Sequence, residues 1–127
     1  KFLVFAHSLD LVVKNVGGDN ILIERDEHYV VVFDFTSAVM YSGTIPDNEA
    51  RRDIMYGARE IISALGGDLK MRTMPEDEHD PDDEYAKRVF AFAEGGSYDA
   101  KLAHQEFYAF VKSRWTGYWP FTAYNIN

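Results

Sequence analysis

The sequence has 127 residues, of which 46% are hydrophobic and 27% charged, with a net charge of −8 and no cysteine. This length predicts one domain, 1–127, with a core of its own, and the composition is too apolar for a disordered chain and too charged for a membrane-embedded one. The lack of cysteine excludes disulfides, thiol catalysis and cysteine-ligated metals, and it favours a cytoplasmic protein.

The first 42 residues predict an antiparallel β-sheet of four or five strands. The opening run begins like a signal peptide, but Asp10 interrupts it and no small-residue cleavage site follows, so we expect a strand. Gly17–Asn20 is a strong turn signal. The run Tyr29–Phe33 is apolar without interruption, which is typical of a central strand covered on both faces. The expected strands are 2–5, 9–16, 21–24, 29–33 and 38–41.

A helix that covers this sheet is expected next. Thr44 and Asp47 have the spacing of a capping box, with Pro46 in the first turn. Apolar residues then recur at three-and-four spacing, and Gly66-Gly67 ends the pattern. Gly57, inside the helix, favours either close packing at that point or a tolerated loss of about 1 kcal/mol. The apolar stripe consists of Ile54, Ala58, Ile61, Ile62 and Leu65.

The second half of the chain predicts one further strand and two helices. Leu69–Met74 alternates apolar and charged residues, as an edge strand does. Asp80 and Pro81 predict the start of a helix that ends at Gly95-Gly96, and Ser97 or Asp99 is expected to cap the last helix. The short connection predicts an antiparallel helical hairpin. The whole is therefore an α+β fold: an N-terminal antiparallel sheet, a covering helix, an edge strand, a helical hairpin and an aromatic tail.

Most of the net charge lies in one segment, since Glu76–Glu84 has seven acidic residues and no basic one. Three interpretations remain: a mobile solvated loop whose acids favour a helix start, a patch that faces a partner, or a Ca²⁺ or Mg²⁺ site, although the EF-hand spacing and glycine are missing. Such a loop can occupy the basic pocket of a nucleic-acid-binding enzyme, because its carboxylates replace the phosphates in the electrostatic field of that pocket. The candidate partner-binding residues here are Glu76, Asp77, Glu78, Asp80, Asp82 and Asp83.

The C-terminal tail holds five aromatic residues within ten positions. Stacking on nucleic-acid bases usually requires a basic groove, and only Lys112 and Arg114 are close in sequence. Packing on the sheet or on a second subunit is the favoured interpretation, and residues of this kind are typical of protein interfaces. Trp115, Tyr118 and Trp119 are therefore also candidate partner-binding residues.

Catalytic signals are weak. The four histidines are scattered, and His104 with Glu106 is the one pair that suggests acid–base chemistry, but residues two apart point to different faces of a helix. No P-loop, nucleophile elbow or HExxH motif occurs. Three arginines of the central helix, Arg51, Arg52 and Arg59, are candidates to bind an anion or phosphate. Because Asp47, Glu49, Asp53 and Glu60 surround them, a solvated face of intrahelical ion pairs is the favoured interpretation. We predict no catalytic residue, no metal and no cofactor.

These observations favour a binding protein over an enzyme. The working hypothesis is a small acidic inhibitor or adaptor whose partner is another protein, such as a nucleic-acid-binding enzyme with a basic groove. In size and charge alone the chain resembles phage- or plasmid-encoded inhibitors of bacterial defence nucleases, of the anti-CRISPR or anti-restriction type. No direct contact with nucleic acid or membrane is expected, and a homo-oligomer is left open.

Two alternatives stay open. One is a small-ligand or nucleotide-binding protein with an aromatic pocket between the sheet and the C-terminal helices, lined by Tyr, Trp and Arg. The other is a hydrolase of unfamiliar design that uses His104 or the acidic cluster.

Overall fold

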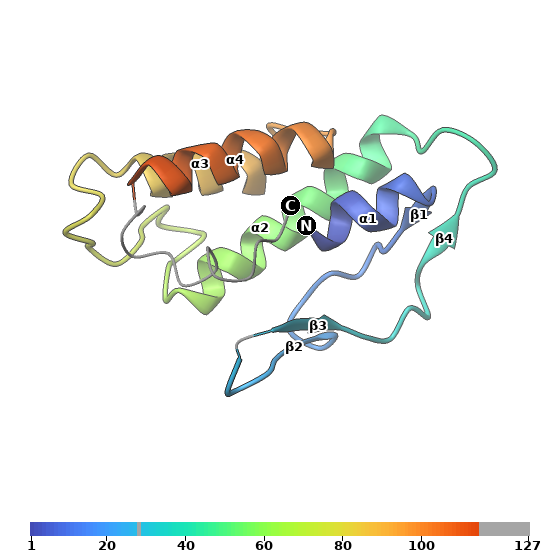
Figure 1. Ribbon diagram of the computed structural model, residues 1–127, viewed down its shortest axis with the longest axis horizontal. Coiled ribbons are helices and arrows are strands. Elements are labelled where there is room, and N and C mark those ends of the chain that lie inside the picture. Colours follow the sequence, from blue (N-terminus) through green and yellow to red (C-terminus); the bar gives the residue numbers. More distant parts are fainter. Residues whose placement is uncertain (28, 115–127) are drawn as a thin grey trace.

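The computed structural model describes residues 1–27 and 29–114 and shows a mixed α+β chain (Figure 1). The helices are α1 (Phe2–Ser8), α2 (Asp47–Ala64), α3 (Glu84–Ala93) and α4 (Ala100–Arg114). The strands are β1 (Leu11–Val12), β2 (Ile21–Ile23), β3 (Val30–Val32) and β4 (Val39–Met40). Within these residues no helix has the length and apolar character needed to cross a bilayer.

The strands form two separate antiparallel pairs instead of one sheet. β1 pairs with β4, and β2 pairs with β3, so the chain runs out and returns along one extended arm, which we define as Leu11–Met40. Figure 1 shows the β2–β3 hairpin at the far end of this arm, apart from the helices. The predicted sheet of four or five strands is thus replaced, in the described part of the chain, by two short ladders.

The chain begins with a helix where a strand was predicted. A short apolar run fits either element, and periodicity alone does not separate them. As a helix, α1 buries Ala6 against Val13 and Val16. It also places Leu3 over α2 at Gly57, where an added Cβ would lie 3.5 Å from the Leu3 Cδ1 atom. The expected second strand, 9–16, is reduced to β1, because the residues after it pack on α1 and α2.

Helix α2 confirms the central prediction, including its end before Gly66, whose φ of +81° a residue with a side chain rarely adopts. The predicted capping box is wrong, because the helix starts at Asp47 without a side-chain cap from Thr44. Ile61 and Leu65, expected on the buried face, are 41% and 48% exposed. The buried face consists of Ala50, Asp53, Ile54, Ala58 and Ile62.

The main core lies between α2 and α3. α4 joins it through Phe107, whose ring centroid lies 5.4 Å from that of Tyr85 and 5.9 Å from that of Phe92. The buried residues of this core are Ala58, Ile62, Val89, Phe90 and Ala93. The expected strand 69–74 is instead a turn closed by one bridge between Asp68 and Thr73. We call the four helices with their core the helical body.

Candidate functional site

The arm is fastened to the helical body by one buried carboxylate. Asp53 of α2 is fully buried, and its Oδ1 and Oδ2 atoms accept the backbone N–H groups of Lys14 and Val13 at 2.7 and 2.8 Å. His7 Nε2 lies 2.9 Å from Oδ2. Because the chain has left β1 at this point, these N–H groups use the carboxylate where a sheet would supply carbonyls.

The prediction that Asp53 belongs to a solvated face is therefore wrong. Its position three residues after Ala50 and next to Ile54 places it on the apolar stripe of α2. A charged residue at a stripe position is the signal in the sequence that could have identified it.

The β2–β3 hairpin carries aliphatic side chains on both faces. Ile23 pairs with Val30, and Leu22 with Val31, so by the alternation of a strand each pair lies on a different face. These four side chains are 59%, 63%, 59% and 47% exposed, respectively. The packing that the described residues show is at the base of the hairpin, where Ile21 contacts α1 and the segment after β1. The expectation that Tyr29–Phe33 is buried on both faces is wrong for the described chain.

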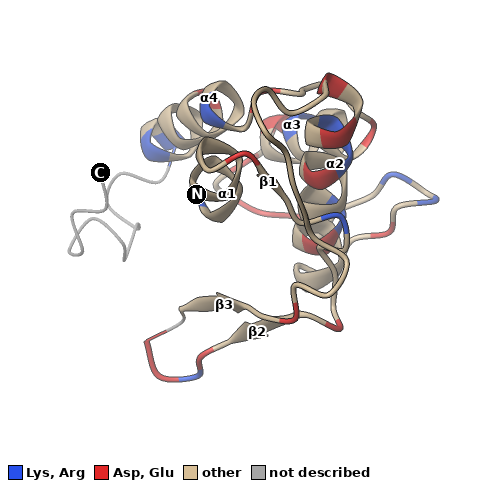
Figure 2. Cartoon of the chain, turned by 90° about the vertical axis from the view of Figure 1, so that its right-hand side faces the viewer, with Lys and Arg blue, Asp and Glu red and all other residues tan. Residues whose placement is uncertain are grey.

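The tip of the hairpin is charged. Glu24, Asp26 and Glu27 with Arg25 give it a net charge of −2, and Figure 2 shows the acidic residues gathered at this end of the arm. The Glu24 carboxylate accepts the backbone N–H groups of Asp26 at 3.1 Å and Glu27 at 2.6 Å, which stabilises the turn. The exposed aliphatic surface is thus bordered by negative charge.

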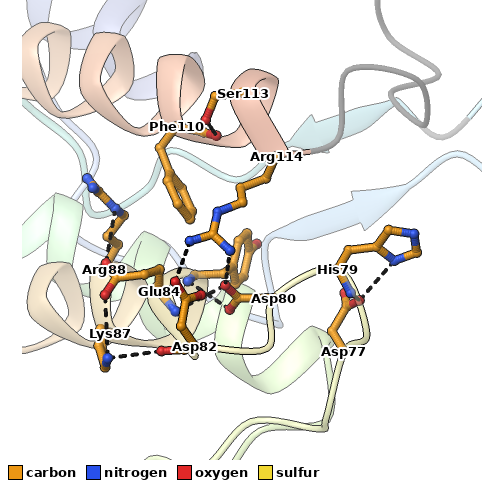
Figure 3. Close-up of polar contacts among 11 residues, drawn as sticks. Asp77, His79, Asp80, Asp82, Glu84, Lys87, Arg88, Phe110, Ser113 and Arg114 are labelled. Atoms are coloured by element: carbon orange, nitrogen blue, oxygen red, sulfur yellow. Dashed lines mark hydrogen bonds and ion pairs between the residues drawn. The ribbon is translucent and has the colours of Figure 1, made fainter.

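The C-terminal end of the acidic segment forms hydrogen bonds with the start of α3. Asp80 is buried, and its carboxylate accepts the backbone N–H groups of Glu84 at 3.0 Å and Tyr85 at 2.8 Å (Figure 3). Those are first-turn donors of α3, so the Asp80 carboxylate stabilises the start of the helix, but the N-cap residue is Asp83 and the predicted N-cap at Asp80 is wrong. The helix itself begins at Glu84, three residues later than the position of Pro81 suggested.

Arg114 joins this helix start to the end of α4. Its Nη2 atom donates to Asp82 Oδ2 at 2.7 Å, and its Nη1 atom lies 3.7 Å from Asp80 Oδ1 (Figure 3). The hydrogen bond from Arg114 lowers the pKa of Asp82 to about 2, and the same bond raises the pKa of Arg114. Two of the candidate partner-binding acids therefore connect α3 to α4.

The remaining described candidates for partner binding lie on the surface of the protein. Glu76, Asp77, Glu78 and Asp83 are exposed, and Asp77 accepts the backbone N–H of His79 at 2.8 Å. Among residues 1–27 and 29–114, no group of three or more His, Asp or Glu side chains is arranged to hold a metal ion. Trp115, Tyr118 and Trp119 lie outside the described residues. Among the described candidates, Arg114 brings Asp80 and Asp82 together.

His104 is half-buried on α4, and burial, helped by the positive charge of Lys1, lowers its pKa. Its ring lies beside that of Tyr108, with 5.8 Å between centroids, whereas Glu106 is exposed on another side of the helix. The expected separation of His104 and Glu106 is confirmed.

A groove of about 500 Å³ lies elsewhere, between α1, the segment before α2 and the start of α4. Of the described residues that line it, Tyr98 is the only Tyr, Phe or Trp, and none is an arginine. It therefore differs from the predicted pocket in both place and composition. Its polar lining includes His7, Ser8, Thr44, Asp47 and Lys101.

Comparisons of this chain with protein-family models, with curated protein sequences and with solved structures find no match.

Proposed function

We propose that this chain is a small acidic protein-binding module, of the inhibitor or adaptor kind, that contacts its partner with the β2–β3 hairpin. The observation that carries the proposal is the half-exposed aliphatic surface on both faces of that hairpin. Exposed apolar patches that are larger than isolated side chains mark interaction sites in soluble proteins. The module would contact its partner through Leu22 and Val31, on the face opposite the one on which Ile21 packs against the helical body.

The charge around the hairpin indicates what kind of partner fits. Leu22 and Val31 supply an apolar centre, and the tip supplies negative charge at its border. A complementary surface has an apolar centre with Lys or Arg beside it, because opposite potentials steer association and fix the orientation. A nucleic-acid-binding enzyme with a basic groove has such a border, which supports the inhibitor version of the proposal.

The test is affinity capture from a lysate of the organism that encodes the chain, with three purified baits. The first is the wild-type protein, and the second is Leu22→Thr with Val31→Thr, which places strand-favouring β-branched residues at both positions but removes the apolar face. The third is the matched acidic variant Glu76→Gln, Asp77→Asn and Glu78→Gln. It leaves Asp80 and Asp82 in place, so that the Asp80 hydrogen bonds to α3 and the Arg114 contact remain.

We expect one stoichiometric partner with the wild-type and acidic-variant baits and its loss with the hairpin variant. Isothermal titration with the purified partner then gives the loss of affinity, and thermal melting shows that each bait is folded. A partner lost with the acidic variant but kept by the hairpin variant would move the site to the acidic segment. No partner with any bait would contradict the proposal.

Small-ligand binding is a second candidate function, and the groove between α1 and α4 is the observation that favours it. Its volume suits a small molecule, and His7 and Tyr98 supply polar groups at its wall. A thermal-shift screen of nucleotides and small amines tests it. A stabilising compound whose effect is lost in Tyr98→Ala supports this function, and no shift from any compound contradicts it.

A further inference from the structure

The buried contact between His7 and Asp53 fixes which nitrogen of the His7 ring carries the hydrogen. Asp53 is fully buried, and each of its carboxylate oxygens accepts a backbone N–H group. Since a carboxylate only accepts hydrogen bonds, His7 Nε2, which lies 2.9 Å from Oδ2, donates its hydrogen to it. In the neutral ring the other nitrogen, Nδ1, then carries the lone pair. Within residues 1–27 and 29–114 Nδ1 has no hydrogen-bond partner.

This ring lies at the wall of the groove between α1 and α4. His7 is one of the residues that line the groove, although only 12% of its side chain is exposed. Nδ1 is not one of the unpartnered polar atoms that the described chain buries, so it is open to solvent while Nε2 faces the buried carboxylate. A histidine that a buried carboxylate orients, with its other nitrogen open to water, has the arrangement of a general base.

We propose that the groove is a hydrolytic site for carboxylic esters, in which His7 is the general base and Asp53 is the residue that positions it. His7 Nδ1 takes a proton from a water molecule as the water oxygen bonds to the ester carbonyl carbon. The bond between that carbon and the alcohol oxygen then breaks, and the imidazolium returns the proton to the leaving oxygen. Asp53 stabilises the imidazolium in the interval. Only water and the ester are consumed, and the products are a carboxylic acid and an alcohol.

The charge of the groove indicates which esters fit. The lining has a net charge of −2 while its histidine is neutral, from three acids and one base: Asp10, Asp47, Asp99 and Lys101. A negative potential disfavours substrates that carry a phosphate or carboxylate group and attracts positively charged ones. The half-exposed ring of Tyr98 adds an aromatic face, which also favours a cation. The inference rests on the second candidate function, because it requires a small molecule in this groove.

The test measures the hydrolysis of two aryl acetates of opposite charge, meta-acetoxy-N,N,N-trimethylanilinium and meta-acetoxybenzoate. His7→Gln is the main variant, because the glutamine amide can still donate to Asp53 but cannot act as a base. His104→Gln is the matched control, since His104 is a half-buried histidine of α4 that is not part of the groove lining. Far-UV circular dichroism and urea denaturation show that each variant is folded.

A third variant tests the positioning role of Asp53. Asp53→Asn keeps the shape of the side chain, but its amide can donate to Nε2, which moves the imidazole hydrogen to Nδ1 and removes the base from the groove. We expect kcat to fall while KM changes little. NMR of the nitrogen-labelled histidine ring should show the change of tautomer in the folded variant, which a loss of stability alone would not produce.

We expect the wild-type protein and His104→Gln to hydrolyse the cationic ester with a kcat/KM at least about tenfold above that of His7→Gln. The anionic ester should be the poorer substrate. Equal rates for the wild-type protein and His7→Gln, or a loss in His104→Gln instead, would overturn the inference. A compound that stabilises the protein through Tyr98, without hydrolysis of either ester, would leave small-ligand binding standing and contradict the catalytic role, so the two proposals fail separately.

Discussion

The helical body and the β2–β3 hairpin are built from equally apolar segments but bury them differently. In the body, Ile62 of α2 and Val89 of α3 are almost fully buried because each helix supplies the other with an apolar stripe. In the hairpin, Val30 and Ile23 face each other across the strands and remain more than half exposed. An apolar run therefore shows that a surface needs a partner, but whether the same chain supplies that partner depends on the tertiary fold.

The largest expected loss of stability comes from removing the Asp53 carboxylate, which joins the arm to the helical body. Asp53→Ala removes the acceptor of the Val13 and Lys14 N–H groups and the partner of His7, and leaves these donors unsatisfied. We expect a loss of about 3–5 kcal/mol in the free energy of unfolding. Urea denaturation measures it, with the exposed Asp47→Ala on the same helix as the control. Equal losses in both variants would show that Asp53 does not hold the arm.

One pair of identical substitutions compares the regions directly. Val89→Thr introduces a hydroxyl group into the core at a side chain that is 1% exposed, and we expect a loss of about 2 kcal/mol. Val31→Thr makes the same change on the outer face of the hairpin, where the expected change is about 0.5 kcal/mol or less. Chemical denaturation of both variants at low protein concentration measures the difference. A similar cost at the two positions would mean that the hairpin is covered in the free protein.

Substitutions at two glycines test how tightly the helical body is packed. Gly57→Ala should raise the free energy of unfolding by about 0.5–1 kcal/mol, because alanine favours the helix and Leu3 leaves ordinary contact distance for the new methyl group. Gly67→Ala is the contrasting control, since its Cβ would lie 2.5 Å from Met74 Sδ and 2.9 Å from Thr73 C=O. Thermal melting should show opposite shifts, and a destabilising Gly57→Ala would indicate that α1 packs more tightly on α2 than described.

The smallest expected effect is at the far end of the body, where Asp82 meets Arg114. The pKa of Asp82 is about 2 in the folded chain, whereas an aspartate without these contacts has a pKa of 3.8. A lowered pKa contributes stability above about pH 4 that is lost as the pH falls towards 2. The melting temperature of Asp82→Asn should therefore lie slightly below that of the wild-type protein near pH 6 and equal it near pH 2. A difference that grows on acidification would contradict this assignment.

The sequence predicted the parts of the fold that local chemistry determines. Three buried positions of the α2 stripe, Ile54, Ala58 and Ile62, follow from spacing within a few residues. So does the Asp99 cap of α4, which accepts the Leu102 N–H at 3.0 Å. It did not predict α1, because a short apolar run has no decisive period. It also placed Tyr29–Phe33 in a core, because nothing in the run itself shows that the arm turns away from the helices.

The candidate site was predicted in part for the same reason. The acidic segment is visible as composition, but the use of Asp80 and Asp82 within the protein depends on Arg114, more than 30 residues away. The stripe position of Asp53 indicates that it is buried, but its partners could not be predicted because they come from a segment 40 residues earlier in the chain. Contacts of this range depend on the tertiary arrangement, which residue spacing along one element does not encode.

The small size of the β2–β3 hairpin also bears on aggregation. A hairpin with two open edges can accept strands on both sides, and successive copies then stack into a fibre without a natural end. Here β2 and β3 have three residues each and end at a charged tip, and short strands and nearby charges both disfavour edge-to-edge addition. The same arm that leaves Ile23 and Val30 in water therefore carries features that oppose open-ended aggregation.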